Sequence, residues 1–266
     1  MEYPRIGNIQ LDGFALLAPM AGVSDLAYRV IARKMGAALT TAEMVSAKGL
    51  YYHNEKTKDM LKIAEEEHPV SLQLFGSDPA VMALGAKVME KAGADIVDIN
   101  MGCPMQKVVK NGDGSALMKN VTLAAEIISA VTAAVKIPVT VKMRLGWSRD
   151  TINAVELAMV AESAGAAAHY CSWTDTGRFL YGNGRLERNQ KGCGCRPYSC
   201  YRKRGCEGRP CSKGTDGGNR MCGSCHWPCG MGNPWVFGAV NTYLETGEIL
   251  PGPSWEERLA MARKHL

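Results

Sequence analysis

The chain has no apolar run that approaches the roughly twenty residues needed by a membrane-spanning helix. Its first five residues also lack the basic stretch followed by an apolar stretch that marks a secretory signal. We therefore expect a soluble, cytoplasmic protein with no membrane partner. A disulfide-stapled miniprotein is excluded as well, because 266 residues with 46% hydrophobic content can bury a sizeable core.

One segment, residues 169–229, contains no Ala, Val or Ile at all. The same segment holds nine of the ten cysteines, eleven glycines and a net charge of +7, which leaves −2 for the rest of the chain. The overall charge of +5 would by itself suggest an acidic partner such as nucleic acid. Because the positive charge belongs wholly to this segment, it says nothing about the remainder.

Residues 14–168 alternate short apolar runs with longer amphipathic runs, as βα units around a parallel sheet do. We expect helices after Ser24, as the N-cap, and after Pro79, and over residues 122–135 and 150–164. The expected strands are residues 14–18, 39–43, 70–74, 96–100 and 139–143, with 165–168 leading into a sixth. This regular spacing favours a (β/α)8 TIM-type barrel over an open doubly wound sheet.

Functional residues of such a barrel lie at the carboxyl ends of its strands. Those ends carry polar or special groups, namely Pro19, Met20, Ala21, Gln73, Asn100, Cys103, Lys142 and Arg144. Each has a structural alternative, since an amide can cap a loop, a lysine can reach solvent and a lone cysteine is usually inert. Because all of these residues lie at strand ends, a functional role is favoured over these structural alternatives. The barrel has no GxGxxG, Walker or HExxH pattern, so Rossmann, triphosphatase and zinc-protease sites have no support.

Several strand-end motifs resemble those of the tRNA-dihydrouridine synthase family, in the family's order. They are Leu17–Gly22 (LAPMAG), Gln73–Gly76 (QLFG), Asp98–Pro104 (DINMGCP) followed by Lys107, Gly114–Leu117 (GSAL), Val141–Arg144 (VKMR) and Met231–Phe237 (MGNPWVF). The resemblance covers residues 5–168 and resumes at 231. It implies a flavoenzyme that reduces the C5–C6 bond of specific uridines in tRNA, with FMN as cofactor and NADPH as reductant.

The resemblance also implies residue roles. Pro19, Met20 and Ala21 would lie against the flavin, Gln73 would bond its polar edge, and Lys142 would stabilise the anionic reduced form. Cys103 would protonate C5 of the uracil, which suits a thiol because its ordinary pKa is about 8.5. Asn100 and Arg144 would contact substrate and flavin, and the target uridine would be flipped out of the tRNA stack. No metal site is implied.

The family pattern is absent between residues 168 and 231, where strands six to eight, a flavin-contacting histidine and phosphate loops are expected. One alternative is an inserted zinc module built on the clustered cysteines, although the paired CxxC spacing is missing. A second comes from the genetic code. Read from the second base of each codon, His169–Arg178 can encode Ile-Thr-Val-His-Gly-Arg-Thr-Arg-Ala-Gly, and Ser199–Gly205 can encode Pro-Val-Ile-Gly-Asn-Gly-Asp. We interpret residues 169–230 as a frameshifted tract.

The sequence predicts residues 1–240 as the FMN-binding barrel and 241–266 as the beginning of a C-terminal helical tRNA-binding domain that is mostly truncated. Ser254 and Glu257 form the pattern of a capping box at the start of a helix. Two other functions stay open at this stage. They are a flavin barrel that reduces a small molecule, and a nonfunctional frameshifted fragment or cysteine-rich metal-binding protein. No protein partner is inferred.

Overall fold

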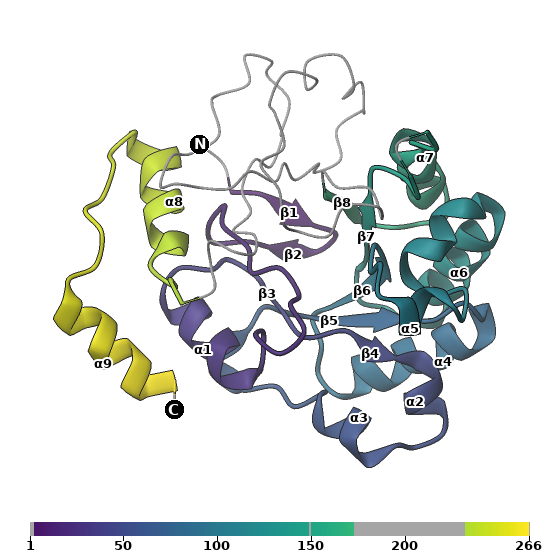
Figure 1. Cartoon of the computed structure of the whole chain (residues 1–266), viewed down its shortest axis with the longest axis horizontal. Coiled ribbons are helices and arrows are strands. Elements are labelled where there is room, and N and C mark those ends of the chain that lie inside the picture. The colour runs from purple at the N-terminus through teal and green to yellow at the C-terminus, as the bar shows by residue number, and fades with distance from the viewer. Residues whose placement is uncertain (1–2, 149, 173–231, 266) are drawn as a thin grey trace.

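The computed structural model describes residues 3–148, 150–172 and 232–265. A curled parallel sheet forms its centre, and Figure 1 shows helices packed around one side of this sheet. The main strands, in spatial order, are β3 (Thr40–Thr41), β5 (Val70–Phe75), β6 (Ile96–Met101), β7 (Val139–Arg144) and β8 (Ala168–Ser172), with β4 (Val45–Ser46) pairing the end of β5. Each neighbouring pair is parallel, as βα units require.

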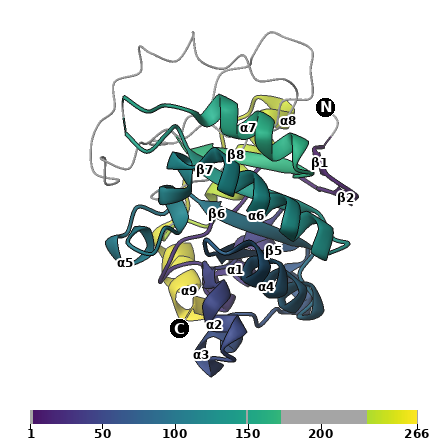
Figure 2. The same cartoon turned by 90° about the vertical axis from the view of Figure 1, so that its right-hand side faces the viewer.

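Helices between the strands cover the outer face of the sheet, as Figure 2 shows for α4, α6 and α7. The helices are α1 (Leu26–Lys34), α2 (Ala47–Tyr51), α3 (Glu55–Asp59), α4 (Pro79–Lys91), α5 (Gln106–Val109), α6 (Val121–Ala134), α7 (Ala154–Ser163), α8 (Val236–Thr246) and α9 (Trp255–His265). Two 3-10 turns, Glu65–Glu67 and Gly114–Lys119, complete the described elements. None of the described helices is long and apolar enough to cross a membrane.

Alternate strand residues face opposite sides of the sheet. Val97, Ile99 and Val141 face the helices and belong to the main hydrophobic core. Asp98 lies between Val97 and Ile99, and Thr140 precedes Val141, so both face the inside of the curled sheet, where they are directly paired across β6 and β7. The inside is apolar at the amino ends of the strands, where the hairpin of β1 (Arg5–Ile6) and β2 (Ile9–Gln10) packs.

Most predicted elements are confirmed, with differences at their boundaries. Asp25, not Ser24, caps α1, because its carboxylate accepts the amide of Tyr28 at 2.8 Å. The expected strand 39–43 is shorter, since only Thr40 and Thr41 pair with β5 before the chain turns into β4. The expected strand 14–18 pairs with the neighbouring segment only through an isolated parallel bridge between Leu16 and Leu39.

The loss of the family pattern after residue 168 predicts that strands six to eight are disrupted, and the sixth strand contradicts this expectation. β8 pairs with β7 over five positions, from Thr140 with Ala168 to Arg144 with Ser172. His169 and Cys171, which begin the unusual tract, therefore continue the parallel sheet. The expected strands seven and eight, together with the frameshifted or zinc-binding interpretation of the tract, fall on residues outside the described ranges.

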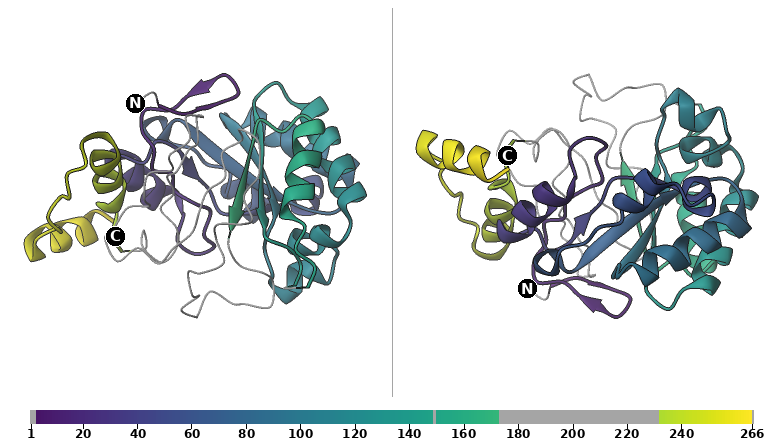
Figure 3. Two further views of the ribbon diagram at one scale, coloured as in Figure 1. Left: turned by 90° about the horizontal axis from the view of Figure 1, so that it is seen from above. Right: turned by 90° about the horizontal axis from the view of Figure 1, so that it is seen from below.

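Helix α8 packs near the start of the chain, on the side of the molecule away from α4, α6 and α7 (Figure 3). Phe237 is fully buried in a cluster with Leu17, Met20 and Tyr28. Asn241 accepts the amides of Phe14 at 2.9 Å and Ala15 at 3.0 Å, and it donates to the carbonyl of Gly36 at 2.7 Å. Helix α8 thus packs directly against the first strand.

The predicted capping box at the start of α9 is confirmed. The Ser254 amide donates to Glu257 at 2.7 Å, and the Glu257 amide donates to the Ser254 hydroxyl at 3.2 Å. Helix α8 runs through residues 240 and 241, where the sequence predicts the boundary between barrel and helical domain.

Candidate active site

The inward residues at the carboxyl ends of β5, β6 and β7 form one polar group. Gln73 pairs with Asp98 in the strand register, and Asn100 pairs with Lys142 one layer nearer the rim. Arg144 follows at the end of β7. Parallel strands end on the same edge, and that edge is where barrel enzymes hold their reacting groups. The structure therefore brings together four of the predicted residues.

A buried carboxylate lies at the base of this group. Asp98 accepts a hydrogen bond from the Thr140 hydroxyl at 2.6 Å and another from the Gln73 amide nitrogen, also at 2.6 Å. Burial raises the pKa of Asp98, while these two hydrogen bonds and the charge of Lys142 act in the opposite direction. Gln73 is only 1% exposed, and its amide is directed by Asp98.

Asn100 fixes the loop that carries Cys103. Its side-chain oxygen accepts the amides of Gly102 at 3.1 Å and of Cys103 at 2.9 Å, while its nitrogen donates to Gln73 at 2.8 Å. The same nitrogen contacts the sulfur of Met44 at 3.6 Å. Both donors and both acceptor positions of the Asn100 side chain are thus used within the protein. The predicted substrate contact of Asn100 stays a prediction.

The Cys103 loop is also held from its other side. The carbonyl of Cys103 accepts the amide of Ser115 at 3.0 Å, and Arg144 donates from its Nε to the carbonyl of Gly102. Cys103 itself is partly exposed, whereas Arg144 is buried. The thiol therefore sits on a loop whose backbone is fixed on both sides, which is what a group that must meet a substrate atom requires.

Lys142 places a positive charge beside this loop. Burial lowers its pKa, with the nearby Arg144 acting in the same direction and Asp98 opposing both. Within the described part of the chain, the Lys142 ammonium makes no hydrogen bond or ion pair. An ammonium in such surroundings favours an anionic or strongly accepting partner.

The predicted residues Pro19, Met20 and Ala21 lie in a turn after the first strand. The Ser24 hydroxyl accepts the amide of Met20 at 2.9 Å and donates to its carbonyl at 3.1 Å. The Gly22 amide donates to Glu43 on the neighbouring segment. Met20 is buried, Pro19 is partly exposed and Ala21 is exposed. The turn therefore presents small apolar groups from a fixed backbone.

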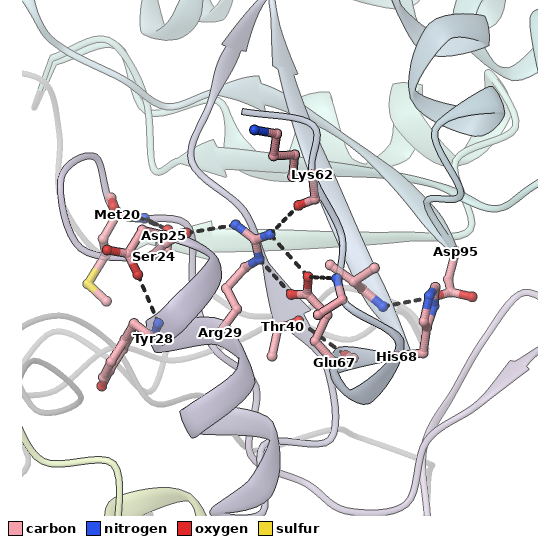
Figure 4. Close-up of polar contacts among 12 residues, drawn as sticks. Met20, Ser24, Asp25, Tyr28, Arg29, Thr40, Lys62, Glu67, His68 and Asp95 are labelled. Carbon is pink, nitrogen blue, oxygen red and sulfur yellow. Dashed lines mark hydrogen bonds and ion pairs between the residues drawn. The ribbon is translucent and has the colours of Figure 1, made fainter. Parts of the chain in front are cut away.

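A buried ion pair lies beside this turn and is linked to it by a hydrogen bond, as Figure 4 shows. Arg29 pairs with Glu67 at 2.6 Å and donates to the carbonyls of Ser24 at 3.2 Å and Lys62 at 2.7 Å. Glu67 also accepts the amide of Ala64 at 2.9 Å. Bidentate pairing together with these further bonds compensates for removing both charges from water.

Sequence reasoning missed three supporting positions. Asp98 and Ser115 were identified only as parts of motifs, and Thr140 was not singled out. The alternation of inward and outward residues along β6 and β7 could have placed Asp98 and Thr140 beneath the rim. Nothing in the sequence pattern signals the contact of Ser115 with Cys103.

A metal site was not predicted in the barrel. Among residues 3–148, 150–172 and 232–265, no three His, Cys, Asp or Glu side chains gather as metal ligands would. Outside these ranges lie the residues of the alternative zinc module, namely Cys193, Cys195, Cys222, Cys225, His226 and Cys229.

Comparisons with known proteins identify a family. The sequence model of the family described as dihydrouridine synthase (Dus) matches residues 16–169. A probable tRNA-dihydrouridine synthase of Rickettsia bellii (strain RML369-C) is 35% identical over 277 residues, covering 98% of this chain and 80% of the relative. The tRNA-dihydrouridine synthase B of Proteus vulgaris is 36% identical over 282 residues, covering 98% and 81%.

Two solved structures resemble part of the chain. Histamine dehydrogenase from Rhizobium sp. 4-9 matches 64% of this chain and 36% of its own, with a TM-score of 0.45 and 12% identity. The structure of TcOYE with pHBA matches 64% and 74%, with a TM-score of 0.48 and 14% identity. The family match and the long pairwise relatives establish that this chain belongs to the tRNA-dihydrouridine synthase family.

Proposed function

We propose that the protein reduces the C5–C6 double bond of uridines in tRNA, with FMN as cofactor and NADPH as the source of hydride. The observation that carries this proposal is the placement of the Cys103 loop and Lys142 on one rim, through the pairing of Asn100 with Lys142. Family membership supplies the reaction class.

The residues at the rim suit a flavin. Lys142 offers an ammonium with no partner among the described residues, which matches the acceptor-rich pyrimidine end of an isoalloxazine. Pro19, Met20 and Ala21 offer a fixed apolar turn for the ring face. Gln73 retains one N–H and one lone pair beyond its bonds to Asp98 and Asn100, so it can still bond the ring edge. Arg144 adds a second cation nearby.

When bound, FMN supplies the hydride that C6 of the uracil receives. C5 must gain a proton so that the C5–C6 double bond becomes a single bond, and Cys103 offers a partly exposed thiol as the donor. Asn100 and Ser115 fix the backbone on either side of this thiol and thereby set its position. Asn100 and Arg144 would also approach the substrate. A base can reach this rim only after it leaves the tRNA stack.

The substitution Cys103→Ala tests the proton donor. Flavin content and flavin reduction by NADPH should be unchanged, because the thiol is not needed for either. Dihydrouridine formation in unmodified tRNA, measured by nucleoside mass spectrometry, should fall by about 10² or more, the range typical of a lost general acid.

Met105→Ala is the matched control. Met105 follows two residues later in the same loop and is 46% exposed, so its removal should leave product formation intact. Full turnover by Cys103→Ala would overturn the donor assignment. Anaerobic NADPH turnover with a small-molecule acceptor in place of tRNA would favour a small-molecule substrate instead.

A further inference from the structure

A continuous chain of hydrogen bonds runs from a buried carboxylate to the Cys103 backbone. Asp98 accepts from Gln73 at 2.6 Å, Gln73 accepts from Asn100 at 2.8 Å, and Asn100 accepts the Cys103 amide at 2.9 Å. Thr140 donates to the other oxygen of Asp98 at 2.6 Å. These links join three strands to the loop that follows β6.

The direction of every bond in this chain follows from one group. Both oxygens of Asp98 accept hydrogen bonds, so Gln73 turns its NH2 group toward Asp98 and its oxygen toward Asn100. Asn100 must then turn its NH2 group toward Gln73 and its oxygen toward the loop. Only in that orientation can Asn100 accept the two loop amides.

The alternative orientations carry a high energetic cost. Asp98 and Gln73 are each 1% exposed and Asn100 is 7% exposed, so water cannot replace a lost partner. An amide turned the wrong way would bring two donors face to face and leave buried groups unpaired. Only the observed orientation of Gln73 and Asn100 therefore forms all the hydrogen bonds that link Asp98 to the Cys103 loop.

We propose that Asp98 is a positioning residue for Cys103, acting through Gln73 and Asn100 to orient the loop that presents the thiol. The inference rests on the proposed role of Cys103 as proton donor. Its evidence, however, is the hydrogen-bond chain itself. Asp98 touches neither substrate nor flavin in this proposal.

The test uses the full chain and two substitutions at one position. Asp98→Ala removes the acceptor, so hydrogen exchange at the amides of Gly102 and Cys103 should accelerate by about fivefold or more, the equivalent of one net hydrogen bond. The rate at which iodoacetamide alkylates the Cys103 thiol should also change in this variant. Mass spectrometry of the peptide that contains Cys103 measures this rate.

Asp98→Asn should rescue both measurements. The new amide can still offer its oxygen to Gln73, and its NH2 group can donate to the Thr140 hydroxyl, which is able to accept. The orientation of Gln73 and Asn100 is then kept although the charge is gone. An Asp98→Asn protein with the fast exchange of Asp98→Ala would overturn the proposal.

Val97→Ala controls for general loss of stability. Val97 is the preceding residue of β6, is fully buried and faces the helices, away from the hydrogen-bond chain. It should lower the unfolding midpoint without selectively loosening residues 102–103, and equal loosening would refute the positioning role. Neither readout needs turnover, so failure here is distinguishable from failure of Cys103→Ala to abolish product formation.

Discussion

The glycine at position 114 lies so close to the Cys103 loop that there is no room for a side chain. Gly114 has φ +61°, and a Cβ there would lie 2.8 Å from the carbonyl oxygen of Cys103 and 2.9 Å from a methyl of Val108. Both neighbours belong to fixed parts of the site, because the Cys103 carbonyl is bonded to Ser115. A side chain at position 114 must therefore displace the thiol loop.

We predict that Gly114→Ala lowers both stability and turnover. The left-handed backbone conformation alone costs roughly 1–2 kcal/mol for a residue with a Cβ, and the clash adds to this. Gly93→Ala is the matched control, since Gly93 has φ +98° but no atom within 4 Å of its Cβ position. Chemical denaturation and product assays should show a stability loss in both variants and a loss of turnover only at 114.

The charge of Lys142 predicts a pH dependence of stability. Its folded-state pKa lies below the ordinary 10.5, so between the two values the unfolded chain binds more protons than the folded one. The free energy of unfolding of the flavin-free protein should therefore rise with pH in that window, relative to Lys142→Met. Denaturation of both proteins across the alkaline range measures this difference. A constant difference would contradict burial as the main cause of the shift.

At the scale of elements, the attachment of α8 to the first strand depends on Asn241. Asn241→Ala leaves the amides of Phe14 and Ala15 and the carbonyl of Gly36 without their partner. We expect a loss of about 2 kcal/mol, the penalty for partly buried unsatisfied backbone groups, seen as a lower thermal midpoint. Asn111→Ala, which removes one exposed bond to Lys107, should change the midpoint little.

The elements that sequence predicts well are those whose pattern is local. Strands β5, β6 and β7 alternate apolar and polar residues, and Asp78 and Asn120 cap the helices that precede β6 and β7. The predicted strand 39–43 includes β3 but is too long, and β4 was not predicted, because pairing with β5 and not their own pattern defines both ends. The contact of Asn241 with Phe14 likewise depends on the folded topology alone.

The candidate site shows the same division. The strand-end positions of Gln73, Asn100 and Lys142 follow from the barrel pattern, and the structure gathers them at one rim. Their partners do not follow from it. That Asn100 uses all of its hydrogen-bonding groups within the protein is visible only from the distances to Gly102, Cys103 and Gln73.

At the scale of the whole molecule, the family model and the pairwise relatives match different lengths of the chain. The family model stops at residue 169, whereas the Rickettsia relative matches 98% of the chain. Residues similar to the relative therefore lie both before and after the cysteine-rich tract. A tract translated in another frame would give this pattern, and that interpretation predicts particular DNA codons.

We predict TCA at Ser172, because only this serine codon, followed by the T of the Trp173 codon, spells CAT for the family histidine in the shifted frame. Gly205 should be GGA, so that GAT for aspartate follows the hidden Gly-Asn-Gly. Sequencing the gene checks both positions. Other codons would mean a genuine insertion, and the zinc alternative would then be measured by metal content. A gene with the frame restored should yield a protein that retains more FMN than the chain as written.

The bonds from Asn241 also have a consequence for synthesis on the ribosome. The amides of Phe14 and Ala15 find their partner 227 and 226 positions later in the chain. Until that residue emerges, the first strand presents unpaired amides beside an apolar surface whose cover, Phe237, has not yet been made. Contacts of such sequence separation form late and slowly, so the nascent barrel passes through a stage with an open edge, which is the stage most exposed to aggregation.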